Sequence, residues 1–79
     1  MSSFDISFVD SQYEGGSEEE KLERFASEAG YWRIYKYKGS EGGDYTNYKA
    51  ISHPGDPQEQ AMFQSPYVHD PVLVYERAS

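Results

Sequence analysis

The sequence contains no cysteine, and this absence excludes several kinds of chemistry. Without thiols the chain has no disulfide framework, no thiolate nucleophile and no cysteine metal site. No run approaches the ~18 apolar residues of a membrane span. The first residues, 1–5, lack the basic and apolar regions of a signal peptide. We therefore expect a cytoplasmic protein that makes no membrane contact and is held together by packing and hydrogen bonds.

Basic charge is also scarce. The chain has 7 Lys and Arg against 14 Asp and Glu, so its formal net charge is −7 and its pI is near 4.6. Nucleic acids and anionic membranes attract basic proteins, and this balance argues against direct binding to either. An acidic chain suits a partner protein with a basic surface, although solubility alone also explains the composition.

The chain is short but rich in aromatic residues. Its 79 residues indicate a single domain, 1–79, with a thin core and little room for a substrate cavity. Aromatic residues make up 16% of the chain, which is too many for a disordered segment. Because each ring buries a large area, the tyrosines, phenylalanines and Trp32 are expected to supply much of the core.

Residues 17–29 predict an amphipathic helix. Ser17 and Glu20 have the spacing of a capping box, in which each side chain satisfies a free backbone donor of the first turn. Leu22 opens an apolar stripe at positions i, i+3, i+4 and i+7. Gly30 follows where a left-handed residue commonly ends a helix.

Four segments have the composition of strands. Apolar residues alternate with polar ones at the N-terminus, which is the pattern of a half-buried strand. Two aromatic-rich runs are joined by the glycine-rich loop 39–44, which predicts a β-hairpin with a long connection. The expected strands are 4–8, 31–38, 45–52 and 72–75.

The expected fold is α+β: a four-stranded, mainly antiparallel sheet with the helix 17–29 packed on one face. A short second helix over 57–64 is left open, with Asp56 as its N-cap and Pro57 at its first position. If it forms, the order β-α-β-β-α-β is that of the ferredoxin-like sandwich. If it does not, one helix covers the sheet.

The first candidate site is the acidic face of the predicted helix. Glu19 and Glu23 fall in one outward row, and Glu20 and Glu28 fall in the next. Such rows could imitate a line of phosphates for a nucleic-acid-binding protein. Glutamates in a first turn also stabilise the helix dipole and keep a surface solvated, which is the more ordinary explanation.

The second candidate is the strand 31–38, which carries three basic residues and no acid. If Trp32 and Ile34 face the core, the outward set is Tyr31, Arg33, Tyr35 and Tyr37. Tyr and Arg are enriched in binding hot spots, yet tyrosines are also good strand formers. A slip of one residue reverses the two faces, so the orientation stays open. In the adjoining loop, Glu41 and Asp44 are further candidate contacts, since loop tips are exposed.

Catalytic and metal chemistry find little support. His53, Asp56, His69 and Asp70 are the only polar cluster, and each pair flanks a proline in a sequence typical of turns. There is no HExxH motif, no third histidine and no nucleophile motif around a serine. We therefore predict no catalytic residue, no cofactor and no metal ligand, and expect that the protein is not an enzyme.

In length, acidity and aromatic content, the chain resembles the small anti-CRISPR and anti-restriction proteins of phages and mobile elements. It also resembles acidic immunity proteins that neutralise nuclease toxins. The likeness is one of profile, without a diagnostic motif. It implies an inhibitor or adaptor that engages a basic, nucleic-acid-binding protein, with mimicry of nucleic acid as one route. The alternatives are a structural or self-assembling phage or bacterial protein, as a homodimer through a strand edge or the tyrosine face, and a small-ligand or metal-binding enzyme built on His53 and His69.

Overall fold

The structure is a computed structural model that describes the backbone of residues 2–78 and the side chains of residues 7–78. It has an α+β fold. In chain order its elements are β1 (Ser2–Asp5), α1 (Ile6–Gln12), α2 (Glu18–Ala29), β2 (Arg33–Lys38), β3 (Tyr45–Ile51), α3 (Pro57–Gln64) and β4 (His69–Glu76).

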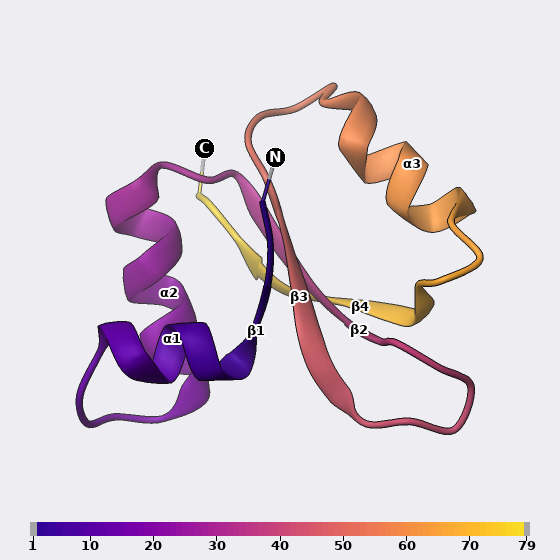
Figure 1. The fold of residues 1–79 in the computed structure, drawn as a ribbon. Helices are drawn as coiled ribbons and strands as arrows, with labels where there is room; N and C mark the ends of the chain where they lie inside the picture. The colour runs from indigo at the N-terminus through magenta and orange to yellow at the C-terminus, as the bar shows by residue number, and fades with distance from the viewer. Residues whose placement is uncertain (1, 79) are drawn as a thin grey trace.

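The sheet is antiparallel, and its strand order is β1-β3-β2-β4 (Figure 1). Three strands form its body: β2 pairs along its length with β3 on one side and with β4 on the other. The four-residue β1 adds to the outer side of β3, with Ser2 opposite Ala50. The β2–β3 hairpin, which was expected from the runs on either side of the glycine-rich loop, is thus the centre of the sheet.

Helices cover both faces of the sheet. Figure 1 shows α1 and α2 together on one side and α3 on the other. Each side has its own buried cluster, because side chains of a strand alternate between the two faces. The protein therefore has two cores separated by the sheet.

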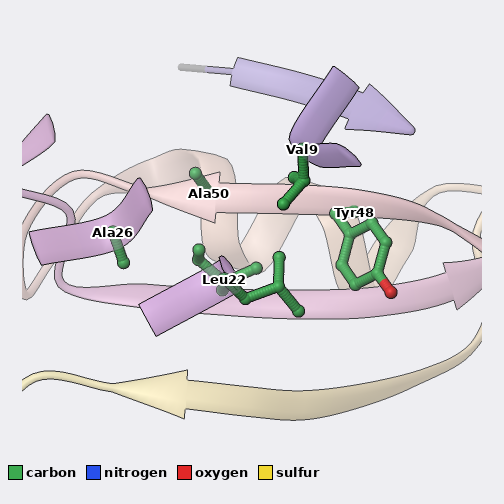
Figure 2. Close-up of a cluster of buried hydrophobic side chains, with 6 residues drawn as sticks. Val9, Leu22, Ala26, Tyr48 and Ala50 are labelled. Carbon is green, nitrogen blue, oxygen red and sulfur yellow. The ribbon is translucent and has the colours of Figure 1, made fainter. Parts of the chain in front are cut away.

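The larger core lies between the sheet and the α1–α2 pair (Figure 2). Leu22 on α2 is almost fully buried, and burial of such a side chain stabilises the fold by about 1.5–3 kcal/mol. Phe25, Tyr31 and Tyr75 pack around the cluster. Its buried members are Val9, Leu22, Ala26, Ile34, Tyr48 and Ala50.

The smaller core lies beneath α3. Its buried members are Tyr35 from β2, Ile51 from β3 and Met62 from α3, with Trp32 and Val68 packed at the margin. Met62 is the only residue of α3 that is buried, and it fixes the centre of this helix in the core.

The helix predicted over 17–29 is confirmed as α2, and the helix left open over 57–64 forms as α3. Ser17 caps α2, because its hydroxyl accepts from the backbone N–H of Glu20 at 3.2 Å. Gly30 ends this helix in the left-handed conformation, with φ 77°. Asp56 caps α3 by accepting from the N–H of Gln58 at 2.9 Å, and Pro57 takes the first position. These caps are formed by residues close together in the chain, which explains why they can be recognised in the sequence.

The expected sheet and its ferredoxin-like order are wrong. The segment expected as the first strand, 4–8, is strand only up to Asp5, and helix α1 begins at Ile6. Residues 2–78 form three helices instead of one or two. In a ferredoxin-like sandwich the last strand lies beside the first and both helices cover one face, whereas here β4 pairs with β2 and α3 lies on the face opposite α1 and α2 (Figure 1).

The reason lies in a competing helical pattern. Val9 is fully buried and Tyr13 packs against the same core, four residues later. The N–H of Tyr13 donates to the carbonyl of Val9 at 3.1 Å, as in a helical turn. This i, i+4 spacing outweighs the short alternation at 4, 6 and 8. The side chains of Phe4 and Ile6, expected in the first strand, lie outside the described side chains.

Helix length also bears on membranes. The longest helix among residues 2–78 is α2, which has 12 residues, and none of the described helices is both long and apolar enough to cross a bilayer.

Candidate functional site

The principal candidate is an acidic surface on α2 and the loop before it. Residues 14–28 contain six carboxylates and two cations, a formal charge of −4. All six carboxylate side chains are exposed. We call this set the acidic surface: Glu14, Glu18, Glu19, Glu20, Glu23 and Glu28.

The two cations of this segment are directed toward α1. Lys21 forms an ion pair with Asp10 of α1, with 3.1 Å between its Nζ and the carboxylate Oδ1. The guanidinium of Arg24 lies over the ring of Tyr13, 5.6 Å from its centroid. Among residues 7–78 no cation comes within ion-pair distance of Glu19 or Glu23. Within the described residues these two side chains therefore have no internal counter-ion.

The other two predicted glutamates of α2 have local contacts. Glu20 accepts from the Ser17 hydroxyl at 3.4 Å, which completes the helix cap. Glu28 accepts from the Tyr13 hydroxyl at 2.9 Å. The pKa of Tyr13 is raised, first by burial and then by this carboxylate. Glu20 and Glu28 thus help to fix the local structure and remain exposed at the edge of the surface.

A shallow hollow runs beside this surface, between α2 and β4. It has a volume of about 510 Å³ and opens broadly to solvent, so it does not enclose a small molecule. Three carboxylates and one guanidinium line it, which favours broad contact with a cationic surface. Its lining residues are Glu20, Glu23, Arg24, Ser27, Glu28 and Tyr75.

The tyrosines of the second candidate site are not a common exposed face. Tyr35 is only 6% exposed and lies in the core beneath α3. Tyr31 packs against the larger core, while Tyr37 is half-buried. The expectation that Tyr35 faces water when Ile34 faces the core is wrong, because helices cover both faces of β2.

Arg33 belongs to a network that holds α3 to the sheet. One oxygen of Glu59, on α3, accepts from the Arg33 guanidinium at 2.7 Å and also from the Tyr35 hydroxyl. Arg33 also donates to Glu76 of β4 at 2.6 Å. Its guanidinium stacks 3.9 Å from the ring centroid of Trp32. This network engages Arg33 within the protein, so it is not an exposed basic anchor.

The network shifts the pKa values of its members. Burial, followed by the Glu59 carboxylate, raises the pKa of Tyr35 to about 12. Burial alone would raise the pKa of Glu59, but the hydrogen bonds from Tyr35 and Arg33 outweigh it and the pKa is lowered. The pKa of Arg33 is raised by Glu59 and Glu76. All three groups therefore keep their charge states over the neutral range.

Glu59 and Glu76 were not predicted as site residues. Glu59 was visible only as an acid in the first turn of a helix, and Glu76 only as the residue after a strand. Their role depends on where α3 lies over β2, and no local sequence pattern indicates that placement.

The remaining predicted contacts lie in the β2–β3 connection. Glu41 and Asp44 are exposed there, and Figure 1 shows this loop well away from α2. Beside it, Lys36 and Lys38 lie over the Tyr45 ring, at 4.6 and 5.1 Å from its centroid. The structure does not combine the loop and the acidic surface into one site.

The histidines do not form a metal site. Nδ1 of His53 lies 2.9 Å from the carbonyl oxygen of Pro54, and Asp56 is occupied as the cap of α3. Within the described residues no three His, Asp or Glu side chains are grouped as metal ligands.

Comparisons with known proteins do not help to interpret these surfaces. No family model matches the chain, and no match was found among curated proteins or solved structures.

Proposed function

We propose that the protein acts by binding a partner protein with a basic surface, as an inhibitor or adaptor, through the acidic surface on α2. The observation that carries this proposal is the direction of the two cations. Because Lys21 and Arg24 contact α1 and the residue after it, they leave Glu19 and Glu23 uncompensated on the outward side of the helix.

Electrostatics supports this choice of surface. Like charges at i, i+4 on a helix are slightly destabilising, so the Glu19–Glu23 pair costs the isolated protein a few tenths of a kcal/mol, roughly 0.2–0.5. A basic partner removes that repulsion on binding. Complementary charge also raises the association rate, which is the main kinetic advantage of a charged interface.

The partner that fits best is a nucleic-acid-binding protein. Such proteins carry basic grooves that bind phosphates, and carboxylates in successive helical turns can occupy the same groove. In this proposal the protein acts in the cytoplasm as an anti-defence protein of the anti-CRISPR type, without catalytic activity of its own. The resemblance in acidity and size supports this class.

The test is capture of a partner from a nuclease-treated bacterial lysate on the immobilised protein, at low salt and at about tenfold higher salt. We expect a nucleic-acid-binding protein to be retained at low salt and released at high salt. Association of the purified partner should slow by on the order of tenfold for the double variant Glu19→Lys/Glu23→Lys, because steering is lost.

A matched control distinguishes an effect of the acidic surface from an effect of the net charge of the protein. Glu41→Lys/Asp44→Lys changes the formal charge by the same amount, from −7 to −3, but does so in the hairpin loop. It should leave association close to that of the original protein. Equal slowing by both double variants, or affinity that does not change with salt, would contradict the proposal.

A further inference from the structure

The face of the sheet opposite the acidic surface carries exposed apolar side chains. Phe63 at the end of α3 is 55% exposed, Tyr67 in the following turn is 78% exposed and Leu73 in β4 is 43% exposed. Phe and Tyr are large apolar groups of the kind that anchor protein interfaces. We call Phe63, Tyr67 and Leu73 the apolar patch.

These residues lie around one buried ring. Phe63 packs edge-on against Tyr35, with 5.3 Å between ring centroids. Leu73 is the cross-strand neighbour of Tyr35, so both side chains point to the α3 side of the sheet. Tyr67 directly precedes Val68, which packs on the core that contains Tyr35. Phe63 and Leu73 therefore adjoin the same buried ring, and Tyr67 lies in the turn between α3 and β4.

The α3 side is also nearly neutral. Among the side chains of residues 7–78, the charged groups that contact or neighbour the core on this side are the network and cap around α3, together with Lys49, which is the β3 neighbour of Tyr35 and so lies on the same face. Two cations, Arg33 and Lys49, stand against three carboxylates, Asp56, Glu59 and Glu76, a formal −1. The acidic surface on the other side carries −4 over residues 14–28.

We propose that the apolar patch binds a second copy of this chain, face to face across a two-fold axis. Two copies each carrying −7 repel one another, and the repulsion is smallest where the α3 sides meet. That arrangement puts the two acidic surfaces on the outside of the dimer, as far apart as the fold permits. A two-fold contact is self-complementary, so each Phe63 and Leu73 meets apolar groups of the other copy.

The free edge of β4 is a poorer place for self-association. Pro71 lies in this strand, Asp70 has a positive φ of 49°, and the pairing with β2 shifts register twice. Proline and bulges are features that protect an edge strand from pairing with another chain. The proposed contact therefore uses side chains of the α3 face and leaves that edge unpaired.

The test compares two neighbouring residues of β4. Leu73 and Val72 are 43% and 42% exposed, but Val72 is opposite Lys36 and points to the other face. Sedimentation equilibrium of the full chain, at protein concentrations up to about 1 mM, should show a dimer. Leu73→Lys should weaken it at least tenfold, and so should Tyr67→Lys, whereas Val72→Lys should leave it unchanged. Circular dichroism confirms that each variant is folded.

The effect of salt distinguishes the proposed dimer from the proposed binding of a basic partner. Screening of the −7 charges should strengthen the dimer, while it should weaken the binding of a basic partner. Glu19→Lys/Glu23→Lys should spare or strengthen the dimer and lose the partner. A monomer at every protein and salt concentration would overturn the dimer. Equal loss with Val72→Lys and Leu73→Lys would also overturn it, because that result indicates pairing through the strand edge.

Discussion

At the scale of single residues, Glu59 joins α3 to two side chains of β2. One of its oxygens accepts from both Arg33 and Tyr35, while Arg33 also reaches Glu76. Hydrogen bonds to a charged group contribute about 1.5–3 kcal/mol, and a buried partner that loses its acceptor costs more than the bond itself. The attachment of α3 to β2 therefore depends strongly on one carboxylate.

Glu59→Gln tests this dependence. The change removes the negative charge but keeps the size, and we expect a loss of about 1–2 kcal/mol in unfolding free energy. Trp32 is the only tryptophan and packs at the margin of the same core, so its fluorescence reports the change. Its emission should shift to the red and become easier to quench. Glu76→Gln, which alters the same guanidinium without touching α3, should change emission much less. Equal effects would show that Glu59 has no special role in holding α3.

At the scale of elements, one core attaches α1 and α2 to the sheet and the other attaches α3. Met62 alone is buried from α3, whereas Val9, Leu22 and Ala26 bury α1 and α2 on the other face. Local opening requires few buried contacts, and α3 has the fewest of the helices described.

Met62→Ala and Leu22→Ala distinguish the two cores. Truncating either buried side chain leaves a cavity and costs about 2–5 kcal/mol. In Met62→Ala the amides of α3 should exchange hydrogen faster while those of α2 stay protected. In Leu22→Ala the loss of protection should extend over α1, α2 and β3. If Met62→Ala instead removed protection uniformly, the two cores would be one cooperative unit.

The same scale shows what the sequence could predict. The ends of α2 follow from local chemistry at Ser17 and Gly30 and were predicted, while Asp56 was named as the cap of a second helix whose formation was left open. The start of α1 was missed, because Val9 and Tyr13 become helical neighbours only when a core exists to bury them. The strand order was missed too, since pairing of β1 with β3 and of β4 with β2 depends on long-range contacts.

The candidate site was predictable only where it is local. The outward rows of α2 follow from helical geometry, so the exposure of Glu19 and Glu23 was expected. That Lys21 and Arg24 turn toward α1 was not, because α1 itself was not expected. The burial of Tyr35 likewise depends on α3 crossing β2, which no pattern within residues 31–38 indicates.

At the scale of the whole molecule, stability should be limited at both ends of the pH range. Backbone donation from Gln58 lowers the pKa of Asp56, and hydrogen bonds from Tyr35 and Arg33 lower that of Glu59 against its burial. Stability from a lowered pKa is present at neutral pH and is lost as pH falls through the folded value. Burial and Glu59 raise the pKa of Tyr35 from 10.0 to about 12, so its contribution is lost as pH rises over that interval.

Urea unfolding followed by Trp32 fluorescence checks the alkaline limb. Between about pH 10 and about pH 12 the original protein should lose stability, because ionisation of Tyr35 is costly beside the Glu59 carboxylate. Tyr35→Phe keeps the ring and removes the titrating hydroxyl, so it should lose less over the same interval. Burial also raises the pKa of Tyr13 and Tyr48, and part of the alkaline loss should therefore persist. An identical loss in the variant would contradict the role assigned to Tyr35.

The central position of the β2–β3 hairpin has a consequence for the order of folding. Its two strands are joined by a loop of six residues, 39–44, whereas each edge strand comes from a distant end of the chain. Contacts close in sequence cost the least chain entropy to form. The hairpin should thus be the template that forms early, with β1 and β4 adding afterwards on opposite sides. Changes near either terminus should accordingly speed unfolding more than they slow folding.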